Sequence, residues 1–228
     1  MANSEKRRGE LDAHRVFVSE TKQVASDIQG QLDRCEQIIR AFQSIFMASE
    51  RVTPDEYALA YENMNDESVR RVSLQALAYA ERQPSPRGDR YITTMFAPEE
   101  KNSAILGLDV GSQPNNMEAL RRARDSNKIA MSAPFVLRQS KPGQLGRDGF
   151  ILRLPVYARG VTPDSVDVRR ASSIGSVGAS FRIAELIAST LSQAPTAIAD
   201  LTVEDISTGS QPRTLYSSRF AGRAGQPP

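Results

Sequence analysis

The sequence contains few of the residues that bind metals, form disulfides or supply imidazole chemistry. It has one cysteine (Cys35), one histidine (His14) and no tryptophan among 228 residues. A single cysteine excludes an internal disulfide, and one Cys with one His excludes zinc sites built on paired cysteines or paired histidines. We therefore expect neither a resident metal nor a cofactor.

The chain also lacks a long apolar run and a large charge of one sign. No stretch of 18 apolar residues and no signal-peptide pattern occurs in the sequence as given, so nothing in it predicts a membrane span. With 29 Lys and Arg against 27 Asp and Glu, the net charge is +2. This balance argues against nucleic acid as a partner, because phosphate binding needs a concentrated basic excess. At 39% hydrophobic and 25% charged residues, the composition is that of a globular protein.

Motifs for catalysis are missing as well. The glycines between residues 143 and 178 match neither a phosphate loop nor a dinucleotide fingerprint. No serine lies in a nucleophile-elbow pattern. His14 lies in the polar N-terminal stretch, where an exposed side chain is expected. The sequence predicts that this segment is not an enzyme.

A long apolar stripe is the clearest positive signal in the first third of the chain. Its members follow one another at steps of three and four residues: Val24, Ile28, Leu32, Cys35, Ile39, Phe42 and Phe46. Such spacing predicts one face of a long helix. The stripe is either core of this chain or a seam that pairs with its twin in a homodimer, and the sequence leaves both open. Cys35 lies on the stripe and is expected to be a buried structural thiol.

A second helix is predicted directly after the first. Thr53-Pro54-Asp55-Glu56 combines a cap residue, a proline in the first turn and a glutamate three residues after the cap. These are the signals of a helix start, and we expect the helix to end near Asn65.

The periodicity then changes to that of short strands. Strands are predicted at 74–80, 91–96, 104–108, 129–137, 150–157, 174–181, 197–206 and 213–216, with helices at 117–125 and 183–191. A turn-forming stretch at 140–146 favours a hairpin, and residues 159–172 are expected to be a loop. Helices that pack against antiparallel strands give an α+β fold.

We interpret this order as two stacked α+β units on one long helix. The two helices occupy 16–66, the first unit 67–158 and the second unit 159–220. Residues 1–15 and 221–228 are expected to be flexible flanks, or remnants of trimming from a longer protein.

Several stretches of the sequence resemble the CHASE domain, the extracytoplasmic sensor of many histidine kinases and nucleotide cyclases. The matching stretches run from about residue 16 to 191: Phe46-Met-Ala-Ser49, Val52-Thr-Pro-Asp-Glu56, Ala78-Tyr-Ala-Glu81, Leu106-Gly-Leu-Asp109, Ala119-Leu-Arg-Arg-Ala-Arg-Asp125, Ser132-Ala-Pro-Phe135, Leu152-Arg-Leu-Pro-Val-Tyr157 and Gly178-Ala-Ser-Phe181. Each stretch is short, but their shared order makes a chance match improbable.

The resemblance implies a fold and a function. It implies a long N-terminal helix followed by two PAS-like units, one distal and one proximal to a membrane, between flanking transmembrane helices. The domain would lie in the periplasm, or outside the plasma membrane, and would sense a small molecule, with an adenine-type or cytokinin-like ligand as one possibility. The full-length protein would be a histidine kinase, favoured over a diguanylate cyclase, and would act as a dimer through its N-terminal helices. The alternative is a structural or dimerisation module without a ligand of its own.

The resemblance also implies a ligand site. In receptor-like members the acidic residue of the leucine-aspartate motif contacts a purine edge, and Asp109 holds that position here. A carboxylate in a half-dry cleft accepts an N–H well, but an Asp before Gly111 and Ser112 also commonly caps a turn or helix.

The remaining candidates are apolar. Met131 and Leu154 correspond to pocket positions, Ala133 shares a strand face with Met131, and Tyr91 is expected to help close the pocket. Core packing is the ordinary alternative for Met131, Leu154 and Tyr91. Leu154 replaces an aromatic residue and Met131 a branched one, so the resemblance does not fix the identity of the ligand.

Overall fold

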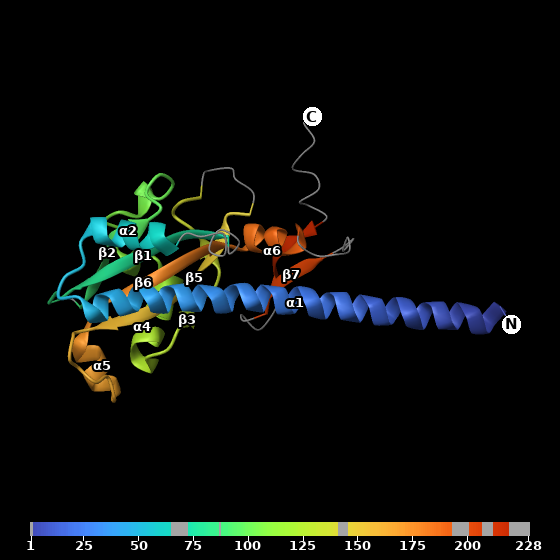
Figure 1. Cartoon of the computed structure of the whole chain (residues 1–228), viewed down its shortest axis with the longest axis horizontal. Helices are drawn as coiled ribbons and strands as arrows, with labels where there is room; N and C mark the ends of the chain where they lie inside the picture. Colours follow the sequence, from blue (N-terminus) through green and yellow to red (C-terminus); the bar gives the residue numbers. More distant parts are fainter. Residues whose placement is uncertain are drawn as a thin grey trace.

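The longest element of the described residues is an N-terminal helix that packs along the body of the molecule and has an exposed N-terminal end (Figure 1). The structure, a computed structural model, describes residues 2–64, 73–86, 88–140, 146–192, 201–206 and 212–218, with side chains from residue 7 onward. Helix α1 (Ala2–Ala48) runs along the body and extends beyond it at its N-terminal end (Figure 1). Residues 2–15, which we expected to form an irregular flank, continue this helix. They are rich in Glu, Lys, Arg and Ala, which favour helix without any apolar stripe.

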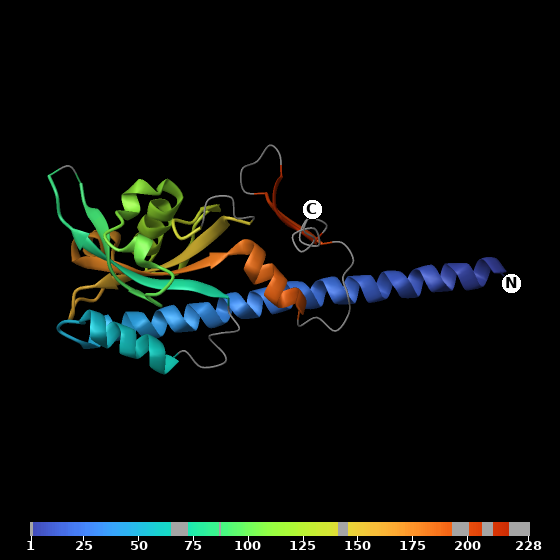
Figure 2. The same cartoon turned by 90° about the horizontal axis from the view of Figure 1, so that it is seen from above.

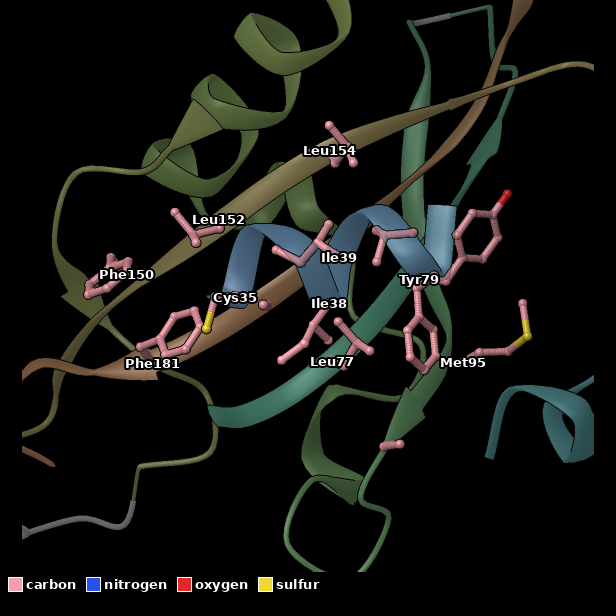
Figure 3. Close-up of a cluster of buried hydrophobic side chains, with 14 of the residues drawn as sticks. Cys35, Ile38, Ile39, Leu77, Tyr79, Met95, Phe150, Leu152, Leu154 and Phe181 are labelled. Carbon is pink, nitrogen blue, oxygen red and sulfur yellow. The ribbon is translucent and has the colours of Figure 1, made fainter. Parts of the chain in front are cut away.

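The apolar stripe of α1 lies against the body of the molecule. Cys35, Ile39 and Phe42 are at most 1% exposed, and Figure 3 shows Cys35, Ile38 and Ile39 among the side chains of the strands. The stripe is therefore core of this chain, which was the first of the two interpretations. Burial raises the pKa of the Cys35 thiol, as expected for a packed and unreactive cysteine.

Helix α2 (Pro54–Met64) begins where the sequence predicted it. The Thr53 amide donates to Glu56 Oε2 at 2.8 Å, and the Glu56 amide donates back to Thr53 Oγ1 at 3.3 Å. These reciprocal bonds confirm the predicted capping box. The cap turns the chain back so that Tyr57 packs edge-on against Phe42, with ring centroids 4.9 Å apart.

Six strands form one antiparallel sheet. Its order is β2-β1-β6-β5-β3, and β4 pairs with β5 beside β3. The strands are β1 (Leu74–Gln83), β2 (Arg90–Ala97), β3 (Ala130–Met131), β4 (Phe135–Val136), β5 (Asp148–Tyr157) and β6 (Ser173–Arg182). The long N-terminal helix and the antiparallel sheet confirm the predicted α+β fold.

Helices cover both faces of this sheet (Figure 2). α1 and α2 lie on one face, and α4 (Pro114–Ser126) lies on the other. Because side chains alternate along a strand, each strand contributes to both faces. Leu77 and Leu152 belong to the core against α1, whereas their neighbours Ala78 and Arg153 line the face below α4.

The position of β6 differs from the sequence prediction. We assigned residues 174–181 to the second unit, but β6 lies between β1 and β5 in the large sheet. The sheet therefore includes residues on both sides of the predicted boundary at 159. The small residues of β6 suit a central strand that large neighbours cross: a Cβ at Gly175 would lie 2.5 Å from Tyr79 Oη.

The rest of the predicted second unit is smaller. Helix α6 (Ile183–Ser192) follows β6, and β7 (Thr202–Asp205) pairs with β8 (Arg213–Ser217) in a two-stranded antiparallel sheet. A buried hydrogen bond of 2.9 Å from Gln31 Nε2 to Thr190 Oγ1 joins α6 to α1.

Several short elements also differ from the predictions. The predicted strand at 104–108 is replaced by a 3-10 turn, η1 (Ser103–Ile105). The predicted strand at 129–137 is reduced to β3 and β4, with Pro134 between them, because proline cannot donate to a strand ladder. The predicted loop at 159–172 contains helix α5 (Val166–Ser172), capped by Ser165. Residues 141–145 of the predicted hairpin turn and 197–200 of a predicted strand lie outside the described residues.

Candidate functional site

The structure brings two of the predicted site residues to the face of the sheet below α4. Tyr91 on β2 is completely buried in a small cluster with Val110, Met117 and Leu120. Asp109 immediately precedes Val110 in the chain, and it pairs with Ile92 of β2 through an isolated antiparallel bridge. Tyr91 and Asp109 therefore lie near one end of α4, as the predicted pocket requires, although the ring of Tyr91 is packed into a core cluster.

The carboxylate of Asp109 is already engaged within the chain. Its Oδ1 accepts from the Gly111 amide at 2.9 Å, which caps the short helix η2 (Val110–Ser112). Its Oδ2 accepts from Arg90 Nε at 2.8 Å. Partial burial acts to raise the pKa of Asp109, but the hydrogen bonds from Arg90 and Gly111 outweigh burial and hold the pKa below its usual range. The capping role is thus present, and an open groove of about 680 Å³ that includes Arg121 borders the carboxylate.

Met131 and Ala133 lie at the edge of the sheet. They border a second, mainly apolar hollow of about 550 Å³ between α1, α6 and β7, together with Phe150 and Leu186. Met131 is 43% exposed. The two residues border the same hollow, but they do not line the groove at Asp109, and their contact with a ligand stays a prediction.

Leu154 lies on the opposite face of the sheet from Tyr91. It is completely buried in the core between β5 and α1, where Figure 3 labels it beside Leu152 and Ile39. The five predicted residues are therefore distributed over three places. A ligand contact at Leu154 stays a prediction, and its packing against α1 is what the structure shows.

A small cavity that sequence reasoning missed lies below α4. It has a volume of about 30 Å³, and four strands, η1, α4 and the segment after β4 line it. Its lining residues are Ala76, Ala78, Thr93, Ile105, Leu108, Gln113, Asn116, Leu137, Arg138, Gln139, Ile151, Arg153, Gly178 and Ser180. The leucine of the leucine-aspartate motif, Leu108, is part of this wall, while Asp109 points away from it into the groove.

Arg153 is the distinctive residue of this cavity. It is 3% exposed, and its Nε donates to Asn116 Oδ1 at 2.8 Å. Its Nη1 is buried without a hydrogen-bond acceptor. Burial lowers the pKa of Arg153 to about 10, so the guanidinium remains charged at neutral pH. Buried cations without a full set of partners are rare and call for a physical explanation.

One signal in the sequence pointed to Arg153. The strand Phe150-Ile-Leu-Arg-Leu-Pro-Val-Tyr157 is apolar except for this residue. A charge inside such a run is either at an edge or facing a partner or ligand. Arg153 was not among the predicted site residues, because the whole strand was interpreted as a family motif.

The described residues offer no obvious metal centre. Among them, no three His, Cys, Asp or Glu side chains gather closely enough to hold a metal ion. Within the same part of the chain, none of the helices combines the length and the apolar character that crossing a membrane demands.

Comparison with known proteins identifies the family. Residues 36–216 match the CHASE domain. The chain belongs to the CHASE domain family. This match covers the C-terminal part of α1, from residue 36 onward, and the strands of both sheets up to residue 216, so the family and the described fold coincide. CHASE is a sensor domain of receptor histidine kinases, and this segment is a sensor rather than a kinase domain.

Plant histidine kinases are among the relatives of this CHASE domain. "Probable histidine kinase 4" of Oryza sativa subsp. japonica is 29% identical over 164 residues, which is 71% of this chain and 16% of that protein. "Histidine kinase 3" of Arabidopsis thaliana is 31% identical over 141 residues, 61% of this chain and 13% of that protein. "Histidine kinase 2" of Arabidopsis thaliana is 32% identical over 111 residues, 48% of this chain and 9% of that protein. The chain thus spans a small part of these relatives.

Removal of the Asp109 carboxylate should destabilise the fold through the loss of a cap. We expect Asp109→Ala to lower the free energy of unfolding by about 0.5–2 kcal/mol, and Asp109→Asn to lower it less because the amide oxygen still accepts from Gly111. Urea denaturation measures both, with the exposed Asp164→Ala as the control. Because the pKa of Asp109 is lowered in the folded state, the advantage of wild type over Asp109→Asn should be complete above the unfolded pKa of about 4. It should shrink as the pH falls through the folded pKa, and an advantage independent of pH would contradict this role.

Proposed function

We propose that this CHASE domain is the extracytoplasmic ligand-sensing module of a membrane-bound receptor, with a histidine kinase favoured as the output domain. Family membership supports the sensor role, and the names of the relatives support the kinase. The observation that supports ligand binding is the cavity below α4, which polar side chains from β2, α4, β5 and β6 line. Convergent polar groups are one feature of a small-molecule pocket, and at about 30 Å³ this cavity would have to widen around any ligand larger than a small functional group.

The structure suggests how a ligand in this cavity would act on α1. Strand β5 contributes Arg153 to the cavity and, on its other face, Leu152 to the core that α1 completes. Gln43 on α1 also donates to the carbonyl of Pro155 on β5. A ligand that shifts β5 would therefore shift α1. Such a ligand changes the signal only if it binds the two positions of β5 with different affinities.

Asp109 remains a proposed ligand contact in the groove outside this cavity, since its carboxylate points away from the cavity. An N–H-bearing ligand, such as the adenine-type molecule that the resemblance implies, would have to take the place of the Arg90 guanidinium at Oδ2. Arg90 is exposed enough to move, with 57% of its side chain accessible. The ligand would approach through the open groove that also contains Arg121.

A ligand screen with two matched variants tests the sensing function. Purines, cytokinins, amino acids and organic acids are each added to the purified chain, and the melting temperature is recorded. A ligand at 100 times its Kd should add about 2.7 kcal/mol to stability. Ala78→Val fills the cavity and should abolish the response. Thr94→Val lies on the opposite face of the same sheet, in the groove near Phe46, and should preserve it.

Two outcomes would count against sensing in the cavity. A response that is equal in Ala78→Val and wild type would place the ligand elsewhere. No response to any class of compound would favour the alternative function, a structural and dimerisation module.

We propose a homodimer both for the sensing module and for the alternative structural module, and the fold indicates which surface would form it. The stripe from Val24 to Phe46 is used inside the chain. On the protruding part of α1, Leu11, Val16 and Phe17 are each more than half exposed. We propose that this part of α1 pairs with its twin, and that flanking membrane helices would raise the effective concentration.

Phe17→Glu should weaken this dimer without affecting the fold, because Phe17 lies outside the core. We expect wild type to show a concentration-dependent dimer in sedimentation equilibrium, and Phe17→Glu to remain monomeric. Ser19→Glu adds the same charge on the same helix without removing an apolar side chain, and should behave as wild type. A wild-type chain that is monomeric at high micromolar concentration would contradict the proposed surface.

A further inference from the structure

The cavity below α4 is positively charged and has no internal counter-ion. Its lining contains Arg153 in the wall and Arg138 at the rim, and none of its lining residues is acidic. Among the described residues, no carboxylate forms an ion pair with Arg153; the only polar side chain that its Nε reaches is Asn116. A buried charge that is left unpaired costs stability, so this arrangement needs a reason other than folding.

The chain makes room for the guanidinium at the centre of the sheet. A Cβ at residue 178 would lie 2.7 Å from Arg153 Nη1 and 2.8 Å from its Cζ. Gly178 is the residue paired with Arg153 across β5 and β6, so the guanidinium lies flat over the backbone of β6. Its unpaired nitrogen is thereby held inside the cavity rather than being free to reach solvent.

A second polar pair completes the wall beside the guanidinium. Asn116 accepts from Arg153 and donates from Nδ2 to Gln113 Oε1 at 2.8 Å. These bonds orient both amides at the start of α4. The Arg153 side chain is thus fixed by one hydrogen bond, while its Nη1 retains a free donor for an incoming acceptor.

The size of the cavity limits what this donor can meet. About 30 Å³ is the share of one water molecule in the liquid, which is also of the order of a carboxylate group. The rest of a larger ligand must displace part of the wall. The Gln139 side chain is held to Ser180 by one hydrogen bond of 3.3 Å, and we expect a ligand to displace this side chain.

We propose that Arg153 binds the carboxylate group of a small organic acid in the cavity below α4. The proposal rests on the ligand-sensing function and names the chemistry of its ligand. The carboxylate accepts from Arg153 Nη1 in a charge-assisted hydrogen bond and neutralises the buried cation. Arg138 at the rim attracts the anion toward the opening.

Acetate and pyruvate, with acetamide and pyruvamide as neutral isosteres, test this proposal. Binding to the whole chain is measured by titration calorimetry and by thermal shift at constant ionic strength. The two carboxylates should bind and raise the melting temperature, whereas the two amides should not. Arg153→Met should weaken carboxylate binding on the order of 30-fold or more, the cost of removing one partner from a buried charge pair. Arg34→Met removes the same charge from the exposed side of α1, away from the cavity and the groove at Asp109, and should bind as wild type does.

Stability without ligand gives an independent readout. If Arg153 is retained for binding, Arg153→Met should melt at the same temperature as wild type or higher when no carboxylate is present. A lower melting temperature for Arg153→Met would show that the guanidinium serves the fold. Gly178→Ala then replaces it as the test variant, because the added methyl group displaces the guanidinium but retains the charge, and it too should weaken carboxylate binding.

The outcomes separate this proposal from the sensing function. Equal carboxylate affinity in wild type, Arg153→Met and Gly178→Ala would overturn the proposal. Binding of adenine, or of the neutral amides, without binding of carboxylates would also overturn it and leave the sensing function intact. Failure of every compound, adenine included, to bind would overturn both.

Discussion

The two faces of the six-stranded sheet are buried in different ways, and the rest of the molecule depends on this difference. On the face toward α1, large apolar side chains such as Leu152 and Phe181 form a continuous core. On the face toward α4, small residues such as Ala78 and Gly178 leave a space, and Arg153 occupies part of it. The first face holds the fold together, which allows the second to carry a polar site at some cost in stability.

The arrangement also gives the sensor a direct mechanical link. β5 and β6 lie next to each other and separate the cavity from α1, so that one layer of backbone stands between the proposed ligand and the helix. Side chains packed at interior density transmit small displacements instead of absorbing them. α1 then continues beyond the body (Figure 2), and any rotation or shift at Leu152 or Pro155 would be carried along a rigid rod. The hydrogen bond from Gln31 to Thr190 joins α6 to the same rod.

Local signals in the sequence predicted local structure well. The stripe that includes Ile39 and Phe42 predicted a long helix, and the reciprocal bonds of Thr53 and Glu56 appear as the capping box required. These features depend on neighbours within a few residues. The central place of β6 could not be predicted in this way, because strand order depends on partners about a hundred residues away: Ala78 pairs with Gly178. Sequence proximity favoured a separate second unit, and the sheet did not follow it.

The candidate site was predictable only in part, for the same reason. The resemblance led to Asp109, and an Asp before Gly111 was also expected to be a cap, which is the role visible in the structure. Whether Leu154 faces a pocket or a core depends on the register of β5 and on which helix covers each face. Successive side chains of β5 point to opposite faces of the sheet. Leu154 therefore faces the core against α1, whereas Arg153, one position earlier, faces the cavity. The unpaired Nη1 of Arg153 is a property of the packed fold and has no counterpart in a short sequence motif.

A crystal structure of the chain grown in acetate tests the central claim most directly. The account predicts density for a carboxylate in the cavity below α4, with one oxygen about 2.7–2.9 Å from Arg153 Nη1, and only water at that place in crystals grown in acetamide. A carboxylate of the protein itself bonded to Nη1, or the same water in both crystals, would contradict it.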